Sequence, residues 1–184
     1  MRILSGIYKG RKLSSPKKNN IRPTSEKTRG AIFDMLNSYF EKNKIISNNF
    51  VVLDCFSGTG AFGIEAISRG SQKVIFSDSS SYSLKLTKKN LNILEISDNV
   101  EIVKVDYTKK FSFPTEIDLF FMDPPYKDKI IEISLNNLLK SNWLKDNCWG
   151  VIETNVSNLE FQNFKINVVK KKKFGQSFIY FIKL

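Results

Sequence analysis

The stretch DCFSGTGAFGIE, residues 54–65, decides how the rest of the chain is interpreted. It follows a short apolar run and contains the pattern G-x-G-x-x-G at Gly58, Gly60 and Gly63. A glycine loop between a strand and a helix is typical of nucleotide-binding α/β proteins, because glycines let the backbone approach a ligand closely. An acid, Asp54, stands four residues before the first glycine, and the loop alone leaves open which ligand it holds.

Short apolar runs alternate with helical periodicity on both sides of this loop. Strands are predicted at 50–55, 73–78, 100–105, 117–122, 149–154, 164–170 and 176–183, with helices after Ser25, after Gly60, over 82–94 and over 129–139. This alternation predicts βαβ units, and therefore an α/β fold with a mostly parallel seven-stranded sheet and helices on both faces. The last two strands have no helix between them. Their tight connection, KKKKFGQ, predicts a C-terminal antiparallel hairpin.

Basic residues gather in the first thirty residues of a chain whose net charge is +11. This segment has nine basic residues against one acid, and it holds four of the five arginines. Because arginine grips phosphate through a planar fork, we predict a nucleic-acid-binding arm over 1–30 on an α/β domain over 31–184. The predicted phosphate contacts are Arg2, Arg11, Lys12, Arg22 and Arg29. The alternative is a solvated tail in a lysine-rich chain. A chain lacking residues 1–20 is expected to keep the sheet and the glycine loop, since both begin after residue 50.

Composition excludes several classes of protein. No apolar run is long enough to span a bilayer, and the N-terminus lacks the continuous apolar segment of a signal peptide, so a cytoplasmic protein without a membrane partner is expected. The two cysteines, Cys55 and Cys148, have no metal-ligand spacing, and the chain has no histidine. We therefore expect no metal site and a chemistry that works without a histidine base.

Four acids follow four successive predicted strands: Asp54, Asp78, Asp106 and Asp123. Parallel strands end at one edge of a sheet, where ligands of open α/β sheets bind. Carboxylates there would repel the pyrophosphate of a dinucleotide, which normally lies on the glycine loop and the helix N-terminus. They suit S-adenosylmethionine, which has no phosphate and carries a cationic sulfonium and α-ammonium group. The second acid, Asp78, is predicted to accept hydrogen bonds from the ribose hydroxyls.

The sequence DPPY at 123–126 is the most specific feature of the chain. Pro124 and Pro125 fix their backbone angles and donate no N–H, so the turn presents carbonyl oxygens beside the Asp123 carboxylate. This is a rigid set of acceptors for an exocyclic amine, and Tyr126 offers a flat face for a base to stack on. The four residues are predicted to form the catalytic site.

Together, DPPY and DCFSGTGAFGIEAISRG resemble the class I methyltransferases that modify exocyclic amines of nucleobases. The N-terminal segments RILSGIYKGRKL and RPTSEKTRGAIFDML are similar to the bacterial 16S ribosomal RNA guanine-N2 methyltransferases of the RsmD type. This resemblance implies a Rossmann-like class I methyltransferase fold and a substrate of 16S ribosomal RNA or a small-subunit assembly particle. It also implies that Gly58 and Gly60 lie against the cofactor and that Asp106 contacts the adenine amino group. One departure is Gly30, where the family pattern has Glu.

The reaction implied is a direct transfer in which the guanine N2 attacks the methyl carbon of the sulfonium. Hydrogen bonds to Asp123 and to the Pro124 carbonyl would hold the amine, and positioning would supply most of the rate. Other readings stay open at this point. They are an adenine-N6 methyltransferase of DNA or RNA, a protein glutamine-N5 methyltransferase, an NAD-dependent oxidoreductase, and an RNA-binding or assembly protein with a vestigial site.

Overall fold

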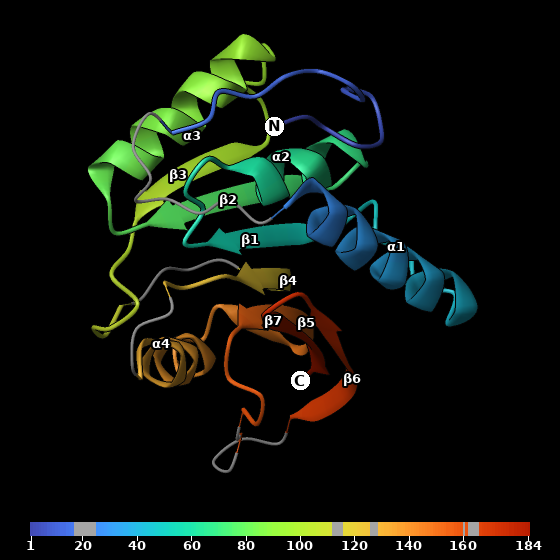
Figure 1. Cartoon of the computed structure of the whole chain (residues 1–184), viewed down its shortest axis with the longest axis vertical. Helices are drawn as coiled ribbons and strands as arrows, with labels where there is room; N and C mark the ends of the chain where they lie inside the picture. Colours follow the sequence, from blue (N-terminus) through green and yellow to red (C-terminus); the bar gives the residue numbers. More distant parts are fainter. Residues whose placement is uncertain (17–24, 112–115, 126–128, 160, 162–165) are drawn as a thin grey trace. The chain divides into compact units, whose positions relative to one another are not determined.

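The computed structural model describes residues 1–16, 25–111, 116–125, 129–159, 161 and 166–184. The chain forms two compact units, Met1–Lys104 and Val105–Leu184. In the described residues there are four helices and seven strands, which alternate along most of the chain (Figure 1). Within that part of the chain, no helix combines the length and apolar character needed to cross a membrane.

The first unit is built on three parallel strands in the order β3-β2-β1. Their bounds are Val51–Cys55 for β1, Lys73–Asp78 for β2 and Val100–Lys104 for β3. Helix α2, Ala61–Ser68, links β1 to β2, and helix α3, Ser81–Ile93, links β2 to β3. Because the strands are parallel, their carboxyl ends share one edge, and Cys55 is opposite Ser77 there.

Helix α1, Glu26–Lys42, precedes this sheet and has a well-formed start. The Ser25 hydroxyl accepts the Thr28 N–H at 3.0 Å, and Glu26 places an acid in the first turn, where the helix dipole favours it. The apolar stripe of the helix is buried; it consists of Ile32, Phe33, Leu36 and Phe40. The helix runs across residue 30, where the sequence predicted the boundary between arm and domain.

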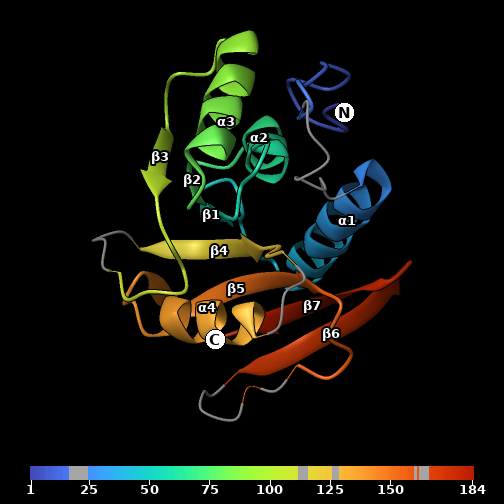
Figure 2. The same cartoon turned by 60° about the vertical axis from the view of Figure 1, so that its left-hand side comes forward.

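The second unit contains four strands in the order β4-β5-β7-β6. Their bounds are Ile117–Met122 for β4, Leu144–Thr154 for β5, Asn167–Phe174 for β6 and Ser177–Lys183 for β7. Strand β4 pairs with β5 in parallel, and helix α4, Ile130–Leu139, connects them. The β5–β7 and β7–β6 pairs are antiparallel, so β6 lies at the outer edge of this unit (Figure 2).

The predicted α/β class, its seven strands and its C-terminal hairpin are confirmed. One local prediction is wrong. The lysines of KKKKFGQ do not connect the two last strands but form the second half of β6, and the turn consists of Gly175 and Gln176 alone. Gly175 has a φ of 57°, which a two-residue hairpin turn requires of its glycine. The other shift is at β5, which begins at Leu144, earlier than the predicted strand.

Candidate functional site

The glycine loop follows the end of β1, and the side chains of Asp54 and Asp78 accept hydrogen bonds from its backbone. The Gly63 N–H donates to Asp54 Oδ2 at 2.9 Å, and the Gly58 N–H donates to Asp78 Oδ2 at 3.0 Å. The Gly60 N–H donates to the Ser57 carbonyl at 2.7 Å. The N–H groups of all three glycines are therefore occupied by oxygens of the protein itself.

Two of these positions require glycine for a physical reason. Gly60 has a φ of 75°, and a Cβ there would lie 2.8 Å from Thr87 Cγ2. At Gly63 a Cβ would lie 2.3 Å from Phe76 Cε1, an aromatic carbon of the buried strand β2. The loop thus combines a left-handed turn with close packing of α2 on the sheet. Phe56, the residue that enters the loop, also has a positive φ of 55°, which is rare for an aromatic residue and indicates local strain.

The carboxyl group of Asp54 is 2% exposed and faces the start of α2. The pKa of Asp54 is raised to about 8, chiefly by burial and to a smaller extent by the nearby charge of Asp78. The Gly63 N–H and the positive charge of Arg29 act against this rise in pKa. The group is therefore a buried acid that changes charge in the neutral pH range.

The carboxylate of Asp78 ties the glycine loop to the start of α3. Besides the Gly58 N–H, it accepts the Ser80 N–H at 2.8 Å through its other oxygen. The residue is at the carboxyl end of β2, where the sequence predicted the ligand of the ribose. Its role toward a cofactor remains a prediction.

Two residues of α3 donate hydrogen bonds to carbonyl groups of the loop, and the sequence did not predict this role. The Thr87 hydroxyl donates to the Gly58 carbonyl at 3.2 Å, and Asn90 Nδ2 donates to the Thr59 carbonyl at 2.9 Å. Asn90 is fully buried and also contacts the N-terminal segment: its Oδ1 accepts the Ser14 N–H at 2.7 Å, and its Nδ2 donates to the Ser14 carbonyl at 3.2 Å. One side chain therefore joins the loop to the N-terminal segment.

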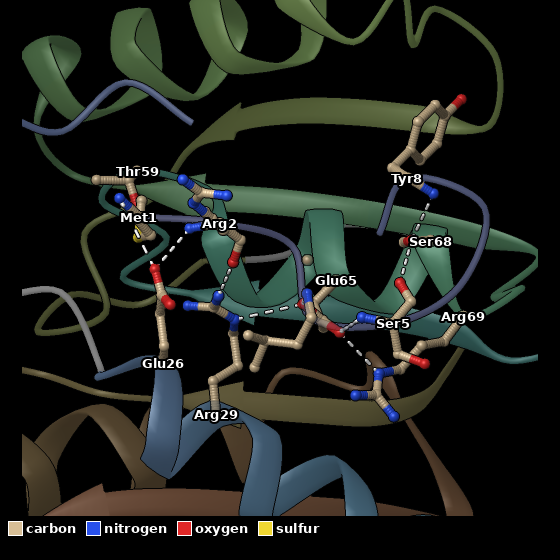
Figure 3. A network of polar contacts seen from close by, with 12 residues as sticks. Met1, Arg2, Ser5, Tyr8, Glu26, Arg29, Thr59, Glu65, Ser68 and Arg69 are labelled. Carbon is tan, nitrogen blue, oxygen red and sulfur yellow. Dashed lines mark hydrogen bonds and ion pairs between the residues drawn. The ribbon is translucent and has the colours of Figure 1, made fainter. Parts of the chain in front are cut away.

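Residues 1–16 are the first part of the predicted arm, and the name arm is kept below for these residues alone. They are packed onto the first unit. Ile3 and Leu13 are buried in its core, and Arg2 and Lys12 form an antiparallel bridge. The buried Glu65 of α2 accepts the N–H groups of Leu4 at 2.8 Å and Ser5 at 3.0 Å (Figure 3). These contacts show that the arm is part of the folded unit rather than a solvated tail.

The arm also completes the C-terminal end of α2. The Ile7 N–H donates to the Ser68 carbonyl at 2.9 Å, and the Tyr8 N–H donates to the Ser68 hydroxyl at 3.0 Å. A helix end needs such donors because its last carbonyls have no partner within the helix. Removal of residues 1–20 would leave this end, Glu65 and Asn90 without these partners. We therefore expect such a chain to lose support for α2 and for the loop, which the sequence did not predict.

Arg29 requires a further correction. Its side chain is fully buried, its Nη2 donates to the Arg2 carbonyl at 2.5 Å, and its Nε lies 3.6 Å from Glu65 Oε2 (Figure 3). Burial lowers the pKa of Arg29, while Glu65 raises it. A guanidinium enclosed in this way cannot contact an RNA phosphate, so its role is to hold the arm on α1 and α2. Arg2, Arg11 and Lys12 are exposed, and Arg22 lies outside the described residues.

The second unit carries the other predicted site residues. Asp106 follows β3 and forms a local turn: its Oδ1 accepts the Thr108 hydroxyl at 2.6 Å and the Thr108 N–H at 3.1 Å. These bonds, led by the one from the hydroxyl, lower the pKa of Asp106.

At the end of β4, Asp123 is half-buried, Pro124 is buried and Pro125 is exposed. Tyr126 lies outside the described residues. Among those residues, no group of three or more acids or cysteines is gathered as a metal ion would need.

Known proteins resemble this chain over most of its length. The model of the family described as Conserved hypothetical protein 95 matches residues 1–183. Ribosomal RNA small subunit methyltransferase D of Haemophilus influenzae is 31% identical, over 84% of this chain and 78% of that protein. The protein of the same name from Escherichia coli is 30% identical, over 86% of this chain and 76% of its own. The solved structure of yhhF from Escherichia coli has a TM-score of 0.83 and 26% identity, covering 100% of this chain and 97% of the other.

Proposed function

The chain belongs to the Conserved hypothetical protein 95 family, and from this premise we propose that it transfers a methyl group from S-adenosylmethionine to a guanine N2 amine of 16S ribosomal RNA. Relatives that carry the name ribosomal RNA small subunit methyltransferase D support this proposal, with at least 30% identity over more than four fifths of the chain. The substrate would be the RNA itself or a small-subunit assembly particle, and the reaction would then take place in the cytoplasm.

The observation that carries the choice of cofactor is the occupancy of the loop N–H groups. A dinucleotide lays its pyrophosphate on free N–H groups of the glycine loop and of the helix N-terminus. Here Gly58 donates to the Asp78 carboxylate, which would repel that anion, and the Gly63 N–H is already occupied by the buried Asp54. The Asp78 carboxylate suits a ligand that offers hydroxyl donors and positive charge. The alternative of an NAD-dependent oxidoreductase therefore finds no support in this loop.

Within the first unit, each acid has a proposed task. Asp78 has one oxygen at the loop and the other at the start of α3. It can accept the ribose hydroxyls in addition to these two N–H groups, since a carboxylate has about four acceptor positions. Asp54 fixes Gly63 and thereby the start of α2. Gly58 and Gly60 let the loop lie against that ligand.

In the second unit, we propose that the hydrogen-bond acceptors at the end of β4 bind the guanine amine. The Asp123 carboxylate and the Pro124 carbonyl would accept the two hydrogens of the guanine amine and turn its lone pair toward the methyl group. No base is needed before attack, because the alkylated nitrogen becomes acidic and loses its proton afterwards. The chain has no histidine, which agrees with a mechanism that depends on positioning. Asp106 is proposed to accept a hydrogen bond from the adenine amino group.

The proposal is tested by binding and by transfer. Calorimetry should detect S-adenosylhomocysteine and no NAD, and the protein should label 16S ribosomal RNA from radioactive S-adenosylmethionine at a guanine N2. Asp123→Ala should abolish most of the transfer while the binding of S-adenosylhomocysteine persists. Labelling at an adenine, or labelling of protein alone, would replace the proposed substrate. Binding of NAD in place of S-adenosylhomocysteine would overturn the proposal that the protein is a methyltransferase.

A further inference from the structure

The positive charge of the chain is concentrated at both of its ends. Residues 161–184 contain six lysines and no acid, whereas residues 31–160 contain 17 acids and 14 basic residues. Four of the six lysines are consecutive, Lys170 to Lys173, and they are part of the edge strand β6. All four are exposed. The second unit therefore has a basic edge that is separate in the chain from the arm.

The strand geometry divides these four lysines between the two faces of β6. Successive side chains of a strand point to opposite faces, so Lys170 and Lys172 share one face while Lys171 and Lys173 share the other. Three of the ammonium groups lie over aromatic rings: Lys171 Nζ is 5.0 Å from the Phe178 ring centre, Lys172 Nζ 5.3 Å from that of Phe174, and Lys173 Nζ 5.6 Å from that of Phe178. The Lys171 ammonium group also donates to the Ser157 carbonyl. These contacts restrict the long side chains, and all four lysines are still exposed to water.

From these observations we propose that β6 is a second phosphate-binding surface for the RNA substrate, with Lys170 to Lys173 as its contacts. The inference rests on the proposed function and adds a site in the second unit. Lysine is a point charge that binds phosphate without the planar fork of arginine, so this surface positions the RNA without reading its sequence. An array that is already ordered on rings loses less side-chain entropy when it binds.

A protective role for the lysines gives a different expectation. Proteins place lysine on exposed edge strands to prevent pairing with another chain, and a lysine-rich composition supplies such residues freely. That role predicts aggregation when the lysines are removed and no change in RNA binding. Phosphate binding predicts weaker RNA binding with a shallower salt dependence, because each contact releases counterions.

The test uses the full chain with paired substitutions. K170Q/K172Q and K171Q/K173Q each remove two charges from one face of β6. The matched control K42Q/K140Q removes two exposed lysines from helix ends, one in each unit. Binding to a 16S ribosomal RNA transcript is measured at several salt concentrations. At least one β6 pair should lower the log–log slope by roughly 0.7–0.9 per lost contact and weaken binding at low salt by on the order of tenfold, beyond the control.

Two further measurements keep the outcome decisive. Replacing all four lysines by arginine retains the charge and should retain the slope, even if a glutamine pair aggregates. The affinity for S-adenosylhomocysteine should stay unchanged in every variant, because the glycine loop belongs to the other unit. If both glutamine pairs give the same salt slope as the control, the proposed β6 surface is overturned. Methyl transfer by the unsubstituted chain would still support the proposed function in that case. Absence of transfer and of cofactor binding in the unsubstituted chain would instead reject the proposed function.

Discussion

Arg29, which holds the arm, and the lysines of strand β6 are all basic, but their charges are used in different ways. In the arm region, Arg29 is enclosed by Glu65 and the Arg2 carbonyl, and the arm backbone donates to buried oxygens. On β6 the lysines are exposed and lie over rings. The difference teaches that the density of basic residues does not reveal their role. Burial separates charges that hold the fold from charges available to a partner.

This comparison also changes how the arm relates to the cofactor loop. Asn90 contacts Ser14 of the arm and Thr59 of the loop, so a displacement of the arm alters the support of the loop. Strand β6 belongs to the other unit. Substitutions in the arm region should therefore change folding and cofactor binding together, whereas substitutions on β6 should change neither.

The largest effect is expected from Glu65→Ala. Glu65 is fully buried and accepts two arm N–H groups, while Arg29 and Arg69 are paired with it. Its removal leaves the buried Arg29 charge without its closest partner, which costs about 3–5 kcal/mol of unfolding free energy. Urea unfolding measures this loss.

The matched control is Asp34→Ala, because Asp34 is a 76% exposed partner of the same Arg69 at 3.9 Å. Surface pairs of this kind contribute less than about 1 kcal/mol. Equal losses for Glu65→Ala and Asp34→Ala would mean that the arm is not anchored by Glu65. The contrast with β6 would then disappear.

Across any one pH unit, a smaller effect is expected from the titration of Asp54. Its pKa of about 8 in the folded chain is above the ordinary value of 3.8, so the folded state binds the proton more tightly than the unfolded state. The resulting stabilisation is complete below pH 4 and is lost as the pH rises through 8, with a slope of at most about 1.4 kcal/mol per pH unit. Unfolding free energies of the parent and of Asp54→Asn should diverge over this range. Asp98→Asn, at an exposed acid of the same unit, should follow the parent, and an unchanged slope in Asp54→Asn would exclude Asp54 as the titrating group.

Asn90→Ala breaks the link between the arm and the loop. It removes hydrogen bonds to Ser14 and Thr59 in a buried position, which should lower stability by about 1–3 kcal/mol and weaken the binding of S-adenosylhomocysteine. Asn92→Ala changes an exposed residue of the same helix and should leave both properties near the parental values. Calorimetry on the two variants decides the matter, since normal cofactor affinity in Asn90→Ala would confine the residue to folding.

The sequence predicted the strands of the sheet and the loop with its acids, because apolar runs and glycine spacing are local signals. Strands β2 and β4 have the predicted bounds. It did not predict Glu65 and Asn90, since a polar residue on a helix gives no sign of whether it faces water or a buried backbone group. Arg29 was assigned to RNA for the same reason. The lysines of β6 were assigned to a turn because an edge strand with exposed faces lacks the alternation of apolar and polar residues.

The smallest effect is expected at Gly30, on the side of α1 that contacts the arm. A Cβ at this position would lie 3.2 Å from Leu4 Cδ1, the flexible end of an arm side chain. Gly30→Ala should gain up to about 1 kcal/mol of helix propensity, and the required shift of Leu4 should reduce this to roughly half while the arm is docked. In the Glu65→Gln background, where the arm is less firmly held, the full gain should return. The difference is a coupling energy between two positions that meet through the arm, and urea unfolding of the four chains of the cycle measures it. Equal gains in both backgrounds would mean that the arm imposes no constraint on Gly30, although Leu4 Cδ1 of the arm lies 3.2 Å from the added methyl group.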